Sequence, residues 1–233
     1  VSGANEAKRV QKEYMQNHRL NIPTLLMADI IHGFRTIFPI PLALGSTWDE
    51  AAVEKMAEIS AKEAAVSGLH VTFSPMVDLV RDPRWGRVME STGEDPLLNS
   101  RLAAAMVRGY QGENLKEDNW RVAACVKHFA AYGGALAGRD YNTVDMSERQ
   151  LREMYLPGYK AGLDAGAKLV MTSFNTVDGI PATGNQWLFR DVLRNEFGFE
   201  GVVISDWGAI KELIPHGVAK DEKQAAELAI KAR

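Results

Sequence analysis

Residues 122–129 read Val-Ala-Ala-Cys-Val-Lys-His-Phe, an apolar run followed by two side chains that can carry charge. Apolar residues in unbroken succession, without polar alternation, are typical of a strand covered on both faces, as in a parallel sheet. Similar short apolar segments recur along the chain between longer amphipathic stretches. We predict strands at residues 24–28, 70–73, 122–129, 168–172 and 201–205.

The segments between these strands carry helix signals. Thr47–Glu50 and Ser147–Gln150 have the spacing of a capping box, which opens a helix. Pro157 should kink or divide the helix that the second box opens, because proline removes a backbone donor and clashes with the preceding turn. A weaker strand candidate covers residues 43–46. The predicted helices cover residues 47–67, 147–166, 186–193 and 221–233.

Alternation of strands and helices predicts a single α/β domain with a parallel sheet. No glycine-rich dinucleotide or phosphate fingerprint follows a strand. Polar residues instead follow many strands, which favours a (β/α)₈ barrel of the TIM type, whose active site collects residues from several strand ends. These residues are Asp29, Asp78, Lys127-His128, Ser173–Asn175 and Asp206-Trp207. Since a complete barrel needs about 250 residues, we expect residues 1–233 to be one incomplete barrel that lacks roughly one strand at each end.

Composition excludes several other classes of function. The formal net charge is −3 and no basic run is present, so we expect no nucleic-acid partner. The apolar segments are too short to cross a bilayer, and no signal peptide is visible. The five histidines have no metal-binding spacing, so we expect no metal and no cofactor. The single cysteine, Cys125, is typical of a small buried strand residue.

Asp206 follows an apolar strand and precedes Trp207. A carboxylate in this position could attack an anomeric carbon while the indole forms a wall for the sugar face, but aspartate also caps helices. Asp29 could accept hydrogen bonds from sugar hydroxyls or cap a turn. Lys127-His128 could serve one site only where the strand ends, since neighbouring strand residues point to opposite faces; a lysine here also fits a Schiff-base enzyme.

Seven segments in order resemble the N-terminal barrel domain of glycoside hydrolase family 3, particularly the bacterial periplasmic β-glucosidases. The resemblance covers essentially the whole chain, and the ordered set is more specific than any single motif. The segments are Ala28–Pro39, Ser74–Asp78, Arg81–Arg87, Gly93–Pro96, Val126–Gly133, Tyr141–Ser147 and Ile204–Ile210.

The resemblance implies roles for individual residues. Asp206 matches the nucleophile, which forms a covalent glycosyl-enzyme intermediate that water hydrolyses with retention. Asp29 matches the acid that grips hydroxyls at the non-reducing end of the terminal sugar. The residues matching the rest of the sugar subsite are Arg87, Lys127 and His128, which bind hydroxyls, and Met171 and Trp207, which line it.

Two positions depart from relatives in the family. Phe174 stands where many relatives have a tyrosine, and Tyr132 stands where the N-acetylglucosaminidase branch has a catalytic histidine. The resemblance implies that the general acid/base is a glutamate of a following α/β sandwich domain, which residues 1–233 do not include. We therefore name no acid/base in this chain, although Glu90, Glu94 and Glu148 are available.

The resemblance thus predicts a retaining, exo-acting β-glycosidase of the β-D-glucosidase type, acting on oligosaccharides or aryl β-glycosides. Periplasmic or secreted localisation is expected by analogy. Three alternatives stay open: a β-xylosidase or arabinofuranosidase of the same family, a Schiff-base lyase that uses Lys127, and a non-catalytic sugar-binding domain.

Overall fold

The structure is a computed structural model that describes residues 3–233. Five parallel strands form one sheet in the spatial order β1-β2-β3-β4-β7. The strands are β1 (Met27–Ala28), β2 (Val71–Thr72), β3 (Ala123–Phe129), β4 (Leu169–Thr172) and β7 (Val202–Ile204). All five lie within the strands predicted from the apolar runs, so those predictions are confirmed.

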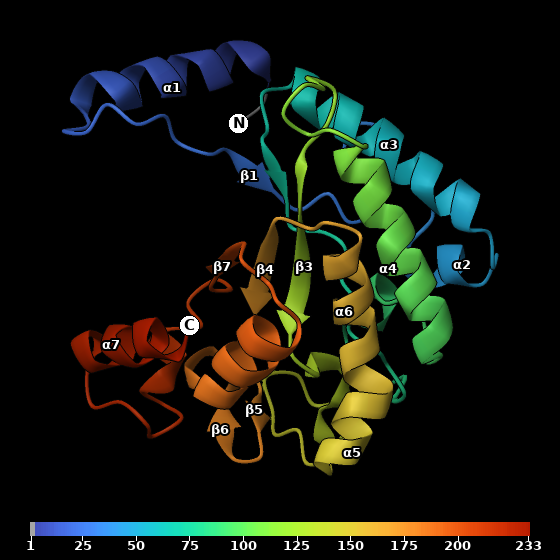
Figure 1. Cartoon of the computed structure of the whole chain (residues 1–233), viewed down its shortest axis with the longest axis vertical. Helices are drawn as coiled ribbons and strands as arrows, with labels where there is room; N and C mark the ends of the chain where they lie inside the picture. Colours follow the sequence, from blue (N-terminus) through green and yellow to red (C-terminus); the bar gives the residue numbers. More distant parts are fainter. Residues whose placement is uncertain (1–2) are drawn as a thin grey trace.

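Helices α3 (Glu50–Val66), α4 (Pro96–Gln111) and α6 (Leu156–Asp164) lie side by side along one face of the sheet (Figure 1). Helix α1 (Ala4–Asn17) projects away from that group (Figure 1). A small antiparallel hairpin, β5 (Thr176–Val177) with β6 (Ile180–Pro181), follows β4. The remaining helical segments are α2 (Pro41–Gly45), α5 (Glu148–Gln150), α7 (Glu222–Ala232), the π-helical η4 (Leu151–Tyr155) and η6 (Trp187–Glu196), and the 3₁₀ turns η1 (Val88–Glu90), η2 (Tyr132–Gly134), η3 (Leu136–Gly138), η5 (Ala182–Gly184) and η7 (Lys211–Leu213).

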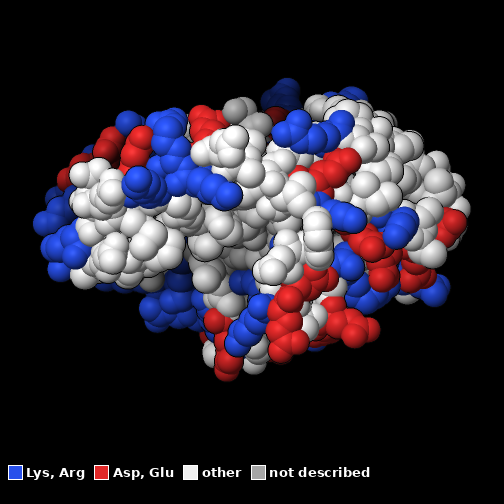
Figure 2. Space-filling model, turned by 90° about the horizontal axis from the view of Figure 1, so that it is seen from above, with Lys and Arg blue, Asp and Glu red and all other residues white. Residues whose placement is uncertain are grey.

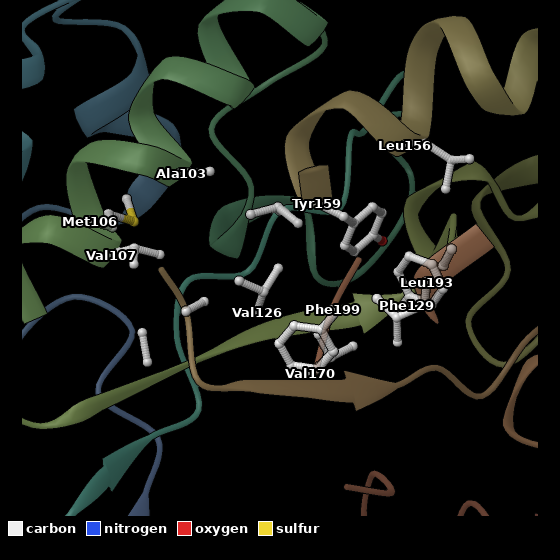
Figure 3. Packing of buried hydrophobic residues seen from close by; sticks show 14 of the residues in the cluster. Ala103, Met106, Val107, Val126, Phe129, Leu156, Tyr159, Val170, Leu193 and Phe199 are labelled. Atoms are coloured by element: carbon white, nitrogen blue, oxygen red, sulfur yellow. The ribbon is translucent and has the colours of Figure 1, made fainter. Parts of the chain in front are cut away.

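The central strands bury side chains on both faces. Val126 and Val170 belong to the main buried cluster, which also contains Met106 of α4 and Leu156 of α6 (Figure 3). The opposite face of the same strands carries a second buried cluster, which contains Val71, Cys125, Leu169 and Met171. This alternation explains the unbroken apolar runs, since every residue of such a strand has apolar neighbours.

Parallel strands joined by helices, with a second apolar cluster on the face away from those helices, make the domain an incomplete (β/α)₈-type barrel, as predicted. Its sheet is an open arc of five strands, whereas a complete barrel has eight. Strands β1 and β7 form the two edges of that arc. Within residues 3–233, no helix combines the length and the apolar character that crossing a bilayer requires.

The structure corrects two local predictions. The weak strand candidate at residues 43–46 is wrong: Pro41 begins α2 there, since proline suits the first turn of a helix. The capping residue of α3 is Asp49, which accepts a hydrogen bond from the Ala52 backbone N–H at 3.0 Å. Thr47 does not cap this helix, because its hydroxyl donates to the Leu44 carbonyl instead.

Other helix signals are confirmed. Ser147 caps α5 by accepting a hydrogen bond from the Gln150 backbone N–H. Pro157 lies in the first turn of α6, directly after the π-helical segment, so it divides the helix as expected. Figure 2 shows acidic and basic side chains next to one another mainly in the lower and right-hand parts of the face, whereas much of the rest is uncharged.

The closest approach of α3 and α4 depends on Gly109. A Cβ at this position would lie 2.3 Å from the Glu54 carbonyl oxygen and 2.6 Å from the Ala57 Cβ. We expect Gly109→Ala to destabilise the domain by about 1–3 kcal/mol through overpacking, seen as a lower midpoint of thermal unfolding. Gly184→Ala is the control, because its Cβ would meet only Leu213 at an ordinary 3.4 Å; equal effects of the two substitutions would contradict this account.

Candidate active site

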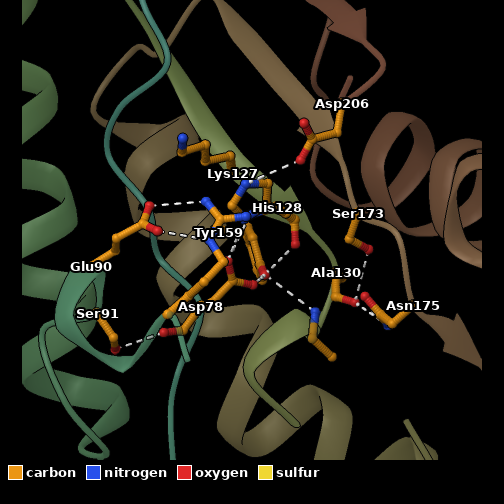
Figure 4. A network of polar contacts seen from close by, with 12 residues as sticks. Asp78, Glu90, Ser91, Lys127, His128, Ala130, Tyr159, Ser173, Asn175 and Asp206 are labelled. Carbon is orange, nitrogen blue, oxygen red and sulfur yellow. Dashed lines mark hydrogen bonds and ion pairs between the residues drawn. The ribbon is translucent and has the colours of Figure 1, made fainter. Parts of the chain in front are cut away.

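Reactive side chains gather at the carboxyl ends of the parallel strands. Asp29 follows β1, and the segment after β2 carries Asp78. Lys127 and His128 lie near the end of β3, and Asp206 follows β7. Figure 4 shows the imidazole of His128 between Asp78 and Asp206. The carboxyl ends of barrel strands are where the active sites of such folds lie.

Lys127 is a buried cation with one carboxylate partner. Its Nζ lies 2.7 Å from Oδ1 of Asp29, and its side chain is 3% exposed whereas that of Asp29 is 63% exposed. A buried ammonium group is costly unless it is paired. Asp29 therefore neutralises Lys127 and still leaves most of its own carboxylate open to a ligand.

His128 is the next residue, and it also serves this site. The register of β3 against β4 shifts between Val126 and Phe129, and the Lys127–His128 peptide bond is cis. The His128 imidazole lies 3.3 Å from the carboxylate of Asp206 through its Nε2 atom. The Lys127 ammonium is near enough to act on the pKa of this imidazole.

Asp78 is completely buried and holds His128 at two points. Its Oδ2 accepts hydrogen bonds from the His128 backbone N–H at 3.0 Å and from Nδ1 at 2.7 Å. Its Oδ1 lies 2.7 Å from the hydroxyl of Tyr159, which reaches the site from α6. A buried carboxylate is tolerated when donors of this kind satisfy its oxygens.

Burial lowers the pKa of His128. Asp78 opposes this effect, and Lys127 and Arg87 reinforce it, so the net direction is downward. The imidazole is therefore neutral near neutral pH. Because Nδ1 faces the carboxylate of Asp78, the hydrogen-bond network assigns the proton to Nδ1 and leaves Nε2 as an acceptor.

The two carboxylate oxygens of Asp206 differ in their surroundings. Oδ1 accepts a hydrogen bond from the Trp207 backbone N–H at 2.6 Å. Oδ2 is buried and has no hydrogen-bond donor among residues 3–233, although Nε2 of His128 lies 3.3 Å away. One oxygen is thus held by the backbone, while the other has its lone pairs unused.

Arg87 is held by Glu90, three residues further on. Nε and Nη2 of Arg87 donate to the two Glu90 oxygens at 2.7 and 2.9 Å. Burial disfavours the charge of Arg87, but the Glu90 carboxylate, together with Asp78 and Tyr132, outweighs burial and raises the pKa of Arg87. The guanidinium also lies 5.6 Å from the ring centroid of Tyr132, whose edge-to-face contact with His128 links this pair to the centre of the site.

Met171 and Trp207 occupy contrasting places. Met171 is buried in the apolar cluster on the face of the sheet away from the helices. Trp207 is 93% exposed, and its ring has no aromatic partner within the part of the chain that the structure describes. The indole ring that we expect to line the sugar subsite is therefore exposed to a ligand, and no other aromatic ring of the described residues packs against it.

Three residues of this network are absent from the predicted site. Asp78 has a sequence signal, its place after a strand. Glu90 has the spacing of a local ion pair with Arg87. Tyr159 has no sequence signal for a role in the site. A tyrosine on the apolar side of a helix is typical of packing, and packing is the role that its sequence context suggests.

Two further strand-end residues support the site indirectly. Ser173 and Asn175 both donate to the Ala130 carbonyl, at 3.4 and 3.2 Å, and so hold the loop that follows β3 (Figure 4). In the described residues, no three His, Cys, Asp or Glu side chains are grouped so as to hold a metal ion. The site is a cluster of carboxylates, two cations and a neutral imidazole at the carboxyl ends of barrel strands.

Comparison with known proteins identifies the family of this barrel. Residues 2–232 match the family described as "Glycosyl hydrolase family 3 N terminal domain". The chain therefore belongs to glycosyl hydrolase family 3.

Individual relatives agree with this assignment. The chain is 49% identical over 227 residues to a periplasmic β-glucosidase of Salmonella typhimurium, covering 97% of this chain and 30% of the relative. A crystal structure of a β-glucosidase from Listeria innocua in complex with isofagomine is 61% identical, with a TM-score of 0.97 over 99% of this chain and 33% of that one. A β-xylosidase of Formosa agariphila is 38% identical, over 93% of this chain and 32% of the relative. The chain thus spans about a third of the length of these relatives.

The Arg87–Glu90 pair gives a testable consequence. Because each partner is about four-fifths buried, removal of one leaves the other poorly compensated, so Arg87→Met and Glu90→Gln should each destabilise the protein. We expect the double variant to lose less than the sum of the two, with a coupling of about 0.5–3 kcal/mol. Thermal unfolding of the four proteins measures this coupling, and strictly additive effects would show that the pair contributes nothing.

Proposed function

We propose that this barrel belongs to a retaining, exo-acting β-glycosidase of the β-D-glucosidase type, which removes terminal non-reducing sugars from oligosaccharides or aryl β-glycosides. The observation that carries the proposal is Asp206: a carboxylate at a strand end, with one oxygen held by the backbone and the other free of any donor within residues 3–233. A carboxylate oxygen that is desolvated and not hydrogen-bonded keeps its lone pairs for attack.

Asp206 is the proposed nucleophile. Its oxygen bonds to the anomeric carbon as the bond to the leaving-group oxygen breaks, and that oxygen takes a proton from the general acid. Water, deprotonated by the same group acting as a base, then attacks the anomeric carbon and releases the sugar and the carboxylate. Two inversions at one carbon give net retention.

We propose that six side chains bind the sugar whose anomeric carbon Asp206 attacks. Asp29 offers an open carboxylate to sugar hydroxyls, and Lys127, which it neutralises, offers donors at the same place. Arg87 and His128 bind further hydroxyls, and Met171 and Trp207 line the subsite. The ion pairs of Lys127 and Arg87 with carboxylates support this role in sugar binding. Sugar hydroxyls both donate and accept hydrogen bonds, so they can bind to carboxylate acceptors and to cationic donors.

We place the general acid/base outside residues 1–233, in a following domain. Two observations support this: the chain spans about a third of its relatives, and Glu90 is engaged with both oxygens by Arg87. Both oxygens of Glu90 are therefore already occupied by the guanidinium of Arg87 and are not presented to a leaving group. In this proposal residues 1–233 form one barrel domain, and an α/β sandwich domain completes the site.

The alternatives differ in support. A β-xylosidase activity has one specific argument, the 38% identity to a protein of that name. A Schiff-base mechanism has no such argument, and the Nζ atom of Lys127 is already hydrogen-bonded to Asp29. Periplasmic or secreted localisation belongs to the proposal as well, since a relative with 49% identity is named periplasmic.

Replacement of the nucleophile is the first test. In the whole protein, we expect Asp206→Ala to lower kcat for aryl β-glucosides by more than ~10³-fold, because the covalent route is lost. Added azide should partly restore turnover by taking the place of the carboxylate. Asp191→Ala, at an exposed helix position, is the control. A 2-fluoro-glycoside that labels any residue other than Asp206 would overturn the assignment.

The position of the acid/base gives a second test. Protonation of the leaving oxygen contributes about 10²- to 10⁴-fold. A protein ending at Arg233, provided circular dichroism shows it folded, should therefore be nearly inactive on cellobiose and should lose less on substrates with very acidic leaving groups. Cellobiose hydrolysis by this segment at the rate of the whole protein would place the acid within residues 1–233.

A further inference from the structure

Asp78 and Tyr159 contact His128 from the side opposite Asp206. Asp78 is completely buried, and Tyr159 is nearly so. The Tyr159 hydroxyl lies 2.7 Å from Oδ1 of Asp78 and 2.6 Å from the His128 carbonyl oxygen, and it accepts from the Ala131 N–H at 3.2 Å. Both side chains contact His128 directly, and Asp78 is also near enough to act on the pKa of Arg87.

The hydrogen bonds of Asp78 determine where the proton of His128 lies. Its Oδ2 already accepts the His128 backbone N–H, so this atom must be an acceptor. The imidazole Nδ1, 2.7 Å from the same atom, must then donate to it. In the neutral imidazole the lone pair then lies on Nε2, 3.3 Å from Oδ2 of Asp206, an oxygen that has no hydrogen-bond partner within residues 3–233.

We propose that Asp78 and Tyr159 are positioning residues for the reaction: they keep the proton of a neutral His128 on Nδ1, so that Nε2 meets the nucleophile Asp206 as an acceptor and never as a donor. This inference rests on the proposed role of Asp206. The two facing acceptors together accept one proton donor, a hydroxyl of the sugar or a water molecule.

Protonation of His128 would reverse this arrangement. A proton taken from solvent onto Nε2 would be donated to Oδ2 of Asp206, and the lone pair needed for attack would be engaged in that hydrogen bond. The active form therefore has His128 neutral, and activity falls at acid pH as Nε2 gains its proton.

Several groups set the protonation of His128. Burial, together with the cations Lys127 and Arg87, opposes a charge on the imidazole, and Asp78 favours it. Asp29 and Glu90 neutralise the two cations, and Asp206 faces Nε2. The groups that face the imidazole from its own and neighbouring elements are Asp78, Arg87, Lys127, Tyr132, Tyr159 and Asp206.

The test uses two substitutions with opposite expected effects in the whole protein. In Asp78→Asn the amide oxygen must still face the His128 N–H, so the tautomer is kept and the negative charge is lost. The acid limb of kcat/KM for an aryl β-glucoside should then move to lower pH, by on the order of 1 unit. In Tyr159→Phe the carboxylate loses a donor and acts more strongly on His128, so the limb should move to higher pH.

Two controls separate positioning from structural support. Tyr155→Phe removes a hydroxyl from another buried tyrosine, one near enough to act on Tyr159, and should leave the acid limb unchanged. When His128 is also replaced by Asn, Asp78→Asn and Tyr159→Phe should no longer move the acid limb, because the imidazole through which they act is absent. Loss of kcat/KM without displacement of the limb, or shifts that persist without His128, would overturn the proposal; if Tyr159→Phe does not fold, Asp78→Asn decides alone.

Failure of the proposed function would be recognised separately. Neutron diffraction from crystals of the whole protein near neutral pH should show a deuteron on Nδ1 of His128 and none on Nε2, whatever the substrate is. A deuteron on Nε2 would overturn the inference. If Nδ1 carries the deuteron but fluoro-sugar labelling finds another nucleophile, the proposed function fails while the positioning of His128 by Asp78 stands.

Discussion

The structure of this site depends on the burial of Lys127 and His128 at the end of the central strand β3. Both side chains are at most 3% exposed, and buried groups that can carry charge must have partners. Asp29 after β1 serves Lys127, and Asp78 after β2 serves His128. The loops that follow the two preceding strands are therefore held at this end of the sheet. Asp206, after β7, then meets an imidazole whose orientation is already determined.

The packing of the helices makes this arrangement possible. Gly158 allows α6 to approach α4 closely, since a Cβ there would lie 2.0 Å from Oδ1 of Asn99. Asn99 in turn donates to Thr92 in the loop that follows Asp78. This close approach brings the hydroxyl of Tyr159, the residue after Gly158, to the carboxylate of Asp78. Gly158, which allows the helices to pack closely, thus directly precedes Tyr159, which contacts the carboxylate that orients the His128 imidazole.

Much of the fold could be predicted, because each signal was local. Strands buried on both faces produce unbroken apolar runs, and all five were found at the predicted places. The errors were local as well. Residues 43–46 are apolar, yet Pro41 starts a helix there, and Asp49 rather than Thr47 caps α3 because it stands directly before the first helical residue. The site residues came from the ordered family motifs, since aspartates at strand ends are equally typical of helix caps.

By itself, the sequence determined the class of fold, the family and the strand ends that carry polar groups, because hydrophobic periodicity and ordered motifs are properties of the chain. Only the tertiary structure decided which of those groups meet. Asp78 pairs with His128, which is 50 positions further along the chain, and with Tyr159, which is 81 positions further along. A local sequence pattern cannot predict contacts over such separations. The same pairing decides which imidazole nitrogen carries the proton, because a tautomer depends on the partner that folding brings into contact and not on the residue itself.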